Sequence, residues 1–342
     1  MACGDALKTA GSAGAKTRVV LTVDVEPTVA GAFDDPEANT PLIHEPVWGA
    51  VAGRSEALGF LIRTLVAHEL AATFFVETVH ASYFSAGPMG RYADELTRAG
   101  QDVQLHLHPT WCNFHDGRLL PDSRVSDHCH RIEDDRLVRL IEEGTARIED
   151  WTGRRPTAMR TGNFSTGRGV FGAMRRAGLR YASNICSAVQ PPGEPELALT
   201  GGVHAIDGIV ELPVTCFADR GPVGRGRLRP LQVTACSFAE TRAILDQLHA
   251  AGGPVAVIVT HPFEFLKRAD ARYSKLRANR LVQTRFERLC AFLADNADRF
   301  ETQPLPAAAA ALTPPSDPPP LAGSPVRSVL RAAQNVLNDR LL

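Results

Sequence analysis

Short runs of β-branched and aliphatic residues alternate along the chain with longer segments in which apolar residues recur every three or four positions. The short runs predict buried strands, and the longer segments predict amphipathic helices. We expect strands over residues 18–27, 71–76, 102–108, 157–160, 181–183, 254–260 and 300–305, with a hairpin formed by 203–206 and 209–214. We expect helices over residues 49–69, 89–99, 134–151, 166–177, 237–249 and 276–296.

Strands that alternate with helices pair in parallel through right-handed crossovers, so the predicted fold class is α/β. About seven such units favour a closed or nearly closed (β/α) barrel over an open sheet. In a barrel of this kind the active site lies at the carboxyl ends of the strands. The ends of the predicted strands are therefore the first place to look for chemistry.

The pattern also divides the chain into four parts. We expect a flexible leader over 1–17, the barrel over 18–305, an Ala/Pro-rich linker that does not pack over 306–325, and a C-terminal amphipathic helix over 326–342. That helix has three arginines and neither lysine nor tryptophan, which makes it a weak membrane-surface helix. We therefore expect it to dock on the body of the protein or on a partner. The Gly-rich basic segment 221–230 is expected to be mobile.

Six polar side chains fall at the ends of predicted strands: Asp24, Glu26, His106, His108, Arg160 and His261. Alternate residues of a strand project from one face, so His106 and His108 can reach the same point, and so can Asp24 and Glu26. A single buried histidine is usually a core residue, and a single acid after a strand often caps a turn. Two pairs at this spacing favour a metal site, because neutral imidazole is the commonest metal ligand.

The segment 109–131 is too long and irregular for an ordinary connection, which indicates either function or disorder. Trp111 is a candidate to stack on a sugar ring, with a core aromatic as the equal alternative. His128 and His130 are alternative ligands, although their polar, charged surroundings favour a solvated position.

Composition narrows the function. The formal net charge of -1 provides no global field that would attract nucleic acid. The seven cysteines are an odd number and lack a C-x-x-C pair, which suits a reducing compartment. The first residues lack the apolar run of a secretory signal, and no apolar segment is long enough to span a bilayer. We expect a cytoplasmic protein.

Five segments, taken in order, resemble the motifs of the polysaccharide deacetylases with a NodB homology domain, carbohydrate esterase family 4. They are Thr22-Val23-Asp24-Val25, Ala72-Thr73-Phe74-Phe75-Val76, the segment from Gly100 to His106, Met159-Arg160-Thr161-Gly162 and Val259-Thr260-His261-Pro262. The segment Glu211-Leu212-Pro213-Val214 resembles a strand that precedes the last motif in several subgroups. The resemblance covers roughly residues 18–305 and implies a distorted (β/α) barrel of about seven parallel strands.

Two positions depart from the family pattern. Val25 stands where the family has its metal-binding aspartate, and Glu26 is the obvious substitute. Thr110 stands where the family has its second metal-binding histidine, and His108 replaces it two residues earlier. Both changes keep one carboxylate and two histidines but alter their spacing.

The resemblance implies that Glu26, His106 and His108 bind a divalent metal, with Asp24 as an alternative ligand. It also implies that Asp24 is the general base, that Arg160 orients it, and that His261 is the acid. A backbone N–H near Thr161 would then help to hold the oxyanion. If Asp24 binds the metal, Glu26 becomes the base.

One carboxylate and two imidazoles suit a catalytic zinc ion, with cobalt, nickel or iron as alternatives. The implied function is removal of an N-acetyl or related acyl group from a small saccharide or a sugar-linked precursor. The alternatives are hydrolysis of a non-sugar amide on the same scaffold and an inactive carbohydrate-binding module. The sequence indicates no oligomeric state.

Overall fold

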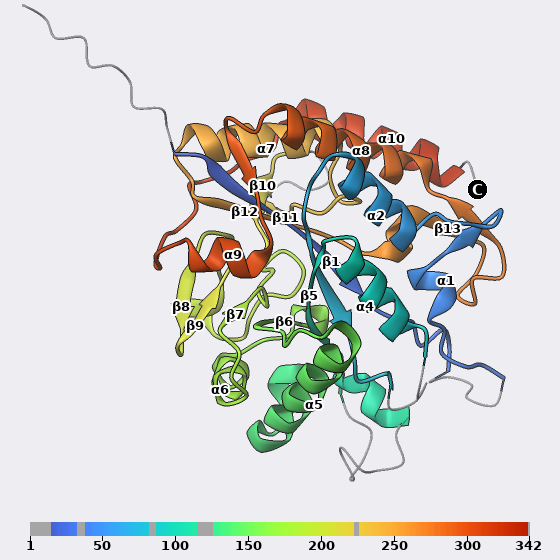
Figure 1. Cartoon of the computed structure of the whole chain (residues 1–342). Helices are drawn as coiled ribbons and strands as arrows, with labels where there is room; N and C mark the ends of the chain where they lie inside the picture. The colour runs from blue at the N-terminus through green and yellow to red at the C-terminus, as the bar shows by residue number, and fades with distance from the viewer. Residues whose placement is uncertain (1–14, 33–37, 82–86, 115–125, 222–225, 341–342) are drawn as a thin grey trace, which may run out of the picture.

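The computed structural model describes residues 15–32, 38–81, 87–114, 126–221 and 226–340, and its main feature is a nine-stranded sheet curled through the molecule (Figure 1). The strands are β1 Thr17–Val25, β4 Thr73–Glu77, β5 Asp102–Leu107, β6 Ala158–Thr161, β7 Tyr181–Ala182, β8 His204–Ile206, β9 Ile209–Glu211, β12 Val255–Thr260 and β15 Phe300–Thr302. Their order is β12-β1-β4-β5-β6-β7-β9-β8, with β15 beside the start of β1. All pairs are parallel except the β8–β9 hairpin.

Irregular backbone joins the two ends of the sheet and makes the barrel a distorted one. The segment that follows β9 bonds to the region after β7, where the N–H of Val214 donates to the carbonyl of Ile185 at 2.9 Å. One residue later, the N–H of Thr215 donates to the carbonyl of Val257 on β12 at 3.1 Å. The predicted distorted barrel of about seven parallel strands is thus confirmed, since β12, β1, β4, β5, β6, β7 and β9 form the parallel series.

Helices cover the outside of the barrel (Figure 1). The longer ones are α2 Leu58–Ala67, α4 Met89–Arg98, α5 Asp134–Thr152, α6 Arg168–Arg176, α7 Phe238–Ala250, α8 Arg280–Asp295 and α10 Pro325–Arg340. Two short helices are α1 His44–Val47 and α9 Leu305–Ala310. Three small antiparallel hairpins lie outside the main sheet: β2 Ala50–Val51 with β3 Arg54–Ser55, β10 Cys216–Asp219 with β11 Arg227–Pro230, and β13 Leu266–Arg268 with β14 Leu276–Ala278. The helix expected over 49–69 begins only at Leu58, because the two strands β2 and β3 precede it. Leu276–Ala278, expected to open a helix, is strand β14.

The core forms because the central strands are apolar on both faces. In β1 only Arg18 is more than slightly exposed, as expected for a parallel strand covered on each side. The start of α7 follows the sequence signal directly: the Ser237 hydroxyl accepts from the Glu240 N–H, and the Glu240 carboxylate accepts from the Ser237 N–H. This reciprocal pair satisfies two amides that the helix itself leaves without partners.

The segment 306–325 corrects the expectation of an unpacked linker. It begins within α9, where Ala308 and Ala309 are buried, and Leu321 is also buried. Ser316 forms a two-way backbone bridge with Val203. Alanine and proline have little side-chain entropy to lose, so such a segment can lie flat on the barrel surface.

Two other sequence predictions concern segments 221–230 and 1–17. Within 221–230, residues 227–230 form β11 rather than a mobile loop, because they pair with β10. Most of the expected leader, residues 1–14, lies outside the described residues, while Thr17 already belongs to β1. Among the helices that the structure describes, none is both long and apolar enough to cross a membrane.

Candidate active site

The six side chains singled out in the sequence meet at one end of the barrel. Asp24 and Glu26 come from the end of β1, His106 and His108 from the end of β5, Arg160 from β6 and His261 from the residue after β12. A cavity of about 180 Å³ is lined by five of them, together with Asn163, Phe164, Val189, Gln232 and Val259. Arg160 is fully buried and contacts the cavity through Asp24.

Glu26, His106 and His108 form a group that could hold a metal ion, with all three ligand atoms within 4.8 Å of one another. The Oε2 of Glu26 lies 2.6 Å from Nε2 of His108 and 3.1 Å from Nε2 of His106. Asp24 is not part of this group, and its Oδ1 accepts from Arg160 instead. The geometry therefore makes Glu26, rather than Asp24, the carboxylate ligand candidate.

Each histidine has a partner that fixes its ring. Nδ1 of His106 donates to the carbonyl of Arg160 at 2.9 Å, and Nδ1 of His108 donates to Asp127 at 2.8 Å. With both Nδ1 atoms engaged, both Nε2 atoms point at Glu26 as potential ligands. A second partner of this kind is the usual way in which proteins orient metal-binding histidines. The donor set and its orientation thus fit a divalent metal.

Asp127 is a site residue that the sequence reasoning missed. Its carboxylate also accepts from the Thr110 N–H at 3.1 Å and from the Asn163 side chain at 2.7 Å. It lies in the irregular segment after β5, where no periodic pattern distinguishes one acid from another. In the sequence Asp127 is one of several acids in this segment, and nothing there singles it out.

The charges of this group reinforce one another. Burial raises the pKa of the Glu26 carboxyl, but the charge of His108 and hydrogen bonds from both histidines outweigh burial and hold that pKa well below its usual range. Burial lowers the pKa of His108, yet Glu26 and Asp127 together raise it well above its ordinary value. Glu26 is therefore ionised at neutral pH and available to a cation.

Arg160 fixes the position of Asp24 from inside the barrel. Its Nη1 donates to Asp24 Oδ1 and to the Thr22 hydroxyl, both at 2.8 Å. Its Nε and Nη2 donate to the carbonyl and the hydroxyl of Ser183 at 2.9 and 2.6 Å. The guanidinium also stacks 4.5 Å from the ring centre of Phe75. Four hydrogen bonds and a ring contact fix the guanidinium of Arg160, and Arg160 in turn fixes Asp24 Oδ1.

His261 faces Asp24 across the cavity. Its Nε2 lies 3.7 Å from Asp24 Oδ2, while its Nδ1 donates to Glu264 Oε1 at 2.9 Å. The other Glu264 oxygen accepts from the Thr260 hydroxyl at 2.7 Å. Burial lowers the pKa of His261, but the hydrogen bond to Glu264 and the charges of Glu264, Asp24 and Glu26 prevail and raise it to about 9. The imidazole therefore carries a proton at neutral pH.

The backbone N–H of Thr161 is not available to an oxyanion. It donates to the Oδ1 of Asn184 at 3.0 Å, inside the wall of the barrel. Asn184 is itself held by Glu211, which accepts from the Asn184 and Ile185 amides. The expectation of an oxyanion donor near Thr161 is therefore not met by the Thr161 N–H itself, which has a structural role.

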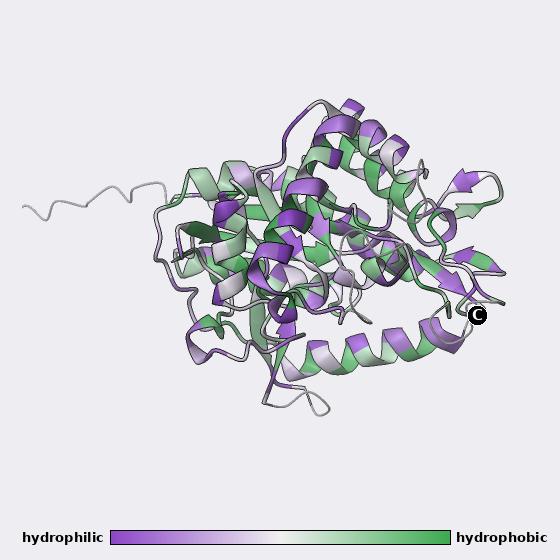
Figure 2. Ribbon diagram, turned by 90° about the horizontal axis from the view of Figure 1, so that it is seen from below, coloured by the Kyte–Doolittle hydropathy of each residue, from purple (hydrophilic) through white to green (hydrophobic). Residues whose placement is uncertain are grey.

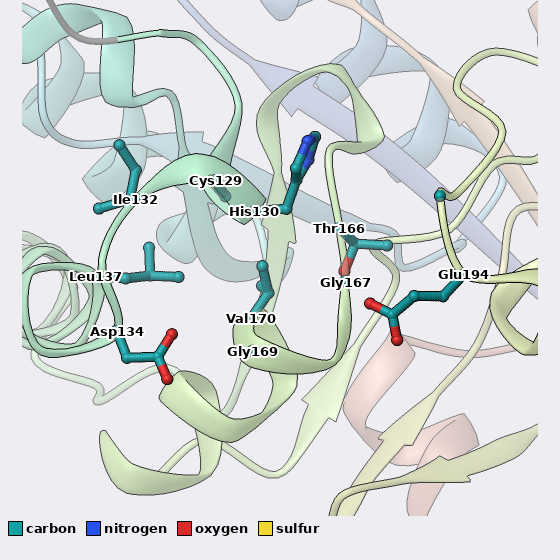
Figure 3. Close-up of a pocket in the computed structure, with 11 residues that line it drawn as sticks. Cys129, His130, Ile132, Asp134, Leu137, Thr166, Gly167, Gly169, Val170 and Glu194 are labelled. Atoms are coloured by element: carbon teal, nitrogen blue, oxygen red, sulfur yellow. The ribbon is translucent and has the colours of Figure 1, made fainter.

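Three aromatic candidates lie away from the cavity. Trp111 is 2% exposed and packs in a core cluster with residues such as Leu107 and Leu137, so it cannot stack on a bound sugar. His128 and His130 are not members of the metal-binding group. His130 instead borders a separate hollow of about 190 Å³, which Figure 3 shows between Leu137 and Asp134 on one side and Thr166 and Glu194 on the other.

The two departures from the family motifs have a physical basis in the structure. The Val25 side chain is fully buried in the largest apolar cluster, on the face of β1 opposite to Asp24. Thr110, where the family has a histidine, is nearly buried and uses its N–H to orient Asp127. Glu26 and His108 therefore occupy the cavity that Val25 and Thr110 do not reach.

A scan of protein-family models gave no match, and a search of curated proteins gave none either. A search of solved structures did find similar proteins. A Mycobacterium smegmatis protein assigned as a polysaccharide deacetylase is 18% identical with a TM-score of 0.47, the match covering 89% of this chain and 96% of that one. A family 4 carbohydrate esterase from Streptomyces lividans, solved with acetate, is 12% identical with a TM-score of 0.41, covering 90% and 98%. A family 4 pseudoenzyme from Bacillus anthracis is 12% identical with a TM-score of 0.40, covering 86% and 66%. The solved structures similar to this chain thus include members of the family that its sequence motifs resemble.

Proposed function

We propose that this protein is a metal-dependent hydrolase that removes an N-acetyl or related acyl group from a saccharide or a sugar-linked precursor. The observation that carries the proposal is the convergence, in one cavity, of a two-histidine, one-carboxylate group with a separate buried carboxylate and a protonated histidine. Sites that combine a metal position with an acid and a base suit hydrolysis of an amide.

Glu26, His106 and His108 would hold the metal, and zinc is the first choice for this donor set, with cobalt, nickel or iron as alternatives. When bound, a divalent cation acts as a Lewis acid on the acyl carbonyl and lowers the pKa of water. Asp127 and the carbonyl of Arg160 keep the two imidazoles oriented for it.

The chain's other residues supply the proton transfers. Asp24 has one oxygen fixed by Arg160 and the other in the cavity, so it can take the proton of the attacking water. As the acyl carbon–nitrogen bond breaks, His261 can give its proton to the departing amine, because it is protonated at neutral pH. The products are a carboxylate, acetate in the simplest case, and a free amine.

The intact base, arginine and acid favour turnover over a binding-only module. A module that only bound sugar would have no use for a buried Arg160–Asp24 pair aligned with a charged histidine. A non-sugar amide remains the second candidate substrate, since the acid, base and metal group act on the amide itself. We also propose a reducing, cytoplasmic location, which is supported by six described cysteines that are all buried free thiols.

The test is elemental analysis of the purified protein together with an assay of acetate release from N-acetylglucosamine oligomers. We expect about one metal ion per chain in the wild type. Glu26→Ala and His106→Ala should lose the metal and the activity, and Asp127→Asn should weaken metal binding about 10- to 100-fold. Asp24→Asn should keep the metal and lose activity.

His130→Ala is the matched control, because this histidine lies outside the metal-binding group and should change neither quantity. A wild type that takes up no divalent metal, or that retains it in both ligand variants, would refute the proposed metal site. Retained metal with release of acyl groups only from non-sugar amides would transfer the assignment to the second candidate.

A further inference from the structure

The C-terminal helix α10 is attached to the body by its polar face. The residues that turn inward are Ser328, Arg331, Asn335 and Asn338, at positions three or four apart. Arg331 donates to Glu240 at 2.8 Å and to Asp219 at 3.2 Å, and Asn335 accepts from Arg285 at 2.7 Å. The predicted docking of this helix on the body is therefore observed, and buried hydrogen bonds and ion pairs hold it there.

The apolar side chains of α10 consequently face outward. Of the eight large hydrophobic side chains that are exposed in the described part of the chain, five belong to this helix. They are Val326 at 68%, Val329 at 50%, Leu330 at 58%, Val336 at 49% and Leu337 at 62% exposed. Figure 2 shows α10 along an edge of the molecule, with hydrophobic bands along its length. An apolar stripe of this length, left in water, marks a contact surface.

Cationic residues lie near the C-terminal half of α10 and on the helix itself. The β13–β14 hairpin, residues 266–278, carries five cationic residues and one acidic residue, Asp270. It lies beside the C-terminal half of α10, since Lys267 donates to the carbonyl of Asn338 and the Asn338 side chain donates to Asn279 at 3.1 Å. On the helix itself, Arg327 and Arg340 are exposed near the two ends, with Asp339 as the one acid. A chain with a formal net charge of -1 thus concentrates positive charge here.

We propose that α10 and the β13–β14 hairpin form a docking surface for an anionic lipid membrane. The apolar stripe would enter the boundary between headgroups and acyl chains, and the nearby cations would contact the negative headgroups. The inward polar contacts of Arg331 and Asn335 fix the helix so that its apolar face stays outward. The helix therefore lies on the bilayer rather than crossing it.

Charge decides against a second copy of the chain as the occupant. A two-fold dimer would place the same surface on both subunits, so two surfaces with an excess of positive charge would be brought together. Like charges brought together in this way repel one another. An anionic lipid surface complements both the stripe and the cationic residues near it.

The experiment is co-sedimentation of the full chain with vesicles of phosphatidylcholine alone or with phosphatidylglycerol added. We expect binding that requires phosphatidylglycerol, falls with salt, and drops at least tenfold in the double variant Leu330→Asp/Leu337→Asp. Lys275→Glu/Arg277→Glu should weaken binding as well. Val66→Asp is the matched control, since Val66 is 52% exposed on α2 and its change should leave vesicle binding unaltered.

Circular dichroism and urea unfolding of each variant would show that the fold is kept, which is expected because the substituted side chains are exposed. A wild type that ignores anionic vesicles, or one whose binding survives the Leu330/Leu337 change, would overturn the proposal. Sedimentation velocity supplies the third outcome: a dimer that the same double variant dissociates would assign the stripe to a second copy instead.

Discussion

At the scale of single residues, the site depends on side chains that hold other side chains. Glu264 touches neither Asp24 nor the metal-binding group, yet its hydrogen bond is the largest contribution that raises the pKa of His261 to about 9 against the effect of burial. Thr260 and Gln232 both donate to the same carboxylate and fix its position. The protonation state of His261, the proposed acid, therefore depends on Glu264, which has no direct part in the proposed reaction.

Glu264→Gln should move the alkaline limit of activity to lower pH. His261 acts as an acid only while protonated, so activity falls as pH rises through its pKa. Without the Glu264 charge that pKa should drop by about one unit or more, and the alkaline limb of kcat/KM should follow it. The measurement is a pH profile of kcat/KM for acetate release in both proteins. Equal metal content would show that the metal group is intact, and superimposable alkaline limbs would contradict the role assigned to Glu264.

The sequence could locate the residues at strand ends but not the residues that support them. Asp24, His106 and His261 stand directly after apolar runs, so the end of a parallel strand fixes where each one goes. Asp127 and Asn184 reach the site from irregular segments, whose path depends on tertiary contacts rather than on any repeat of apolar residues. For Trp111 the sequence left two interpretations equally open, and the structure shows the core aromatic, because closeness in sequence to the histidines did not bring its side chain into the cavity.

At the scale of elements, α10 shows what an amphipathic pattern leaves open. The spacing of Val329, Leu330, Val336 and Leu337 predicts a helix with one apolar face, and the helix is present. The same spacing does not say which face contacts the body. Here the polar face does, because Asp219 and Glu240 are buried acids on the body that need a cationic partner. The choice of face was settled by residues about ninety or more positions away in the chain.

Arg331→Met should detach α10 from the body. The change keeps an unbranched apolar stem but leaves Glu240 and Asp219 buried without one of their charged partners. Removal of one member of a buried ion pair costs about 3–5 kcal/mol, and the lower end applies because Arg229 still pairs with Asp219. Urea unfolding would measure the loss, and limited proteolysis would show earlier cleavage near α10.

Arg327→Met is the matched control for this prediction. Arg327 is exposed on the same helix, so the same substitution should change the free energy of unfolding by less than about 0.5 kcal/mol. If both variants unfold and are cleaved like the wild type, the buried ion pairs do not hold α10.

At the scale of the whole molecule, the barrel closes where its sheet is least regular. Between β9 and β12 the strands do not pair directly. Across this gap Thr215 exchanges hydrogen bonds with Val257 on β12, and an isolated parallel bridge joins Gln232 to Val259. Glu211, at the end of β9, stands at the start of this gap and accepts from the amides of Asn184 and Ile185 at 3.1 and 3.0 Å. The sequence placed the hairpin but gave no sign of this closure, because the residues that form it have no strand pattern.

Glu211 also makes the stability of the molecule depend on pH. Burial raises the pKa of its carboxyl from an ordinary value of 4.5 to about 7, although the two amides and the charge of Arg160 oppose the shift. The folded protein therefore binds a proton here that the unfolded chain releases between these two values. This contribution to stability is complete below pH 4.5 and is lost as pH rises through about 7.

Glu211→Gln should remove that dependence. Glutamine has the shape of the neutral acid and cannot ionise. Between pH 4.5 and 8 the free energy of unfolding of the variant, minus that of the wild type, should therefore rise by about 3 kcal/mol. Urea unfolding of both proteins at several pH values measures the difference, and every other titrating group, His261 included, cancels in it. At pH 5 the variant should be the less stable protein, because its NH2 group would lie against a backbone N–H that donates to the acid in the wild type. This difference in stability should narrow or reverse by pH 8. Parallel stability curves across this range would mean that Glu211 is ionised in the folded protein even at pH 5, and the closure of the barrel would then rest on a buried carboxylate charge balanced by Arg160.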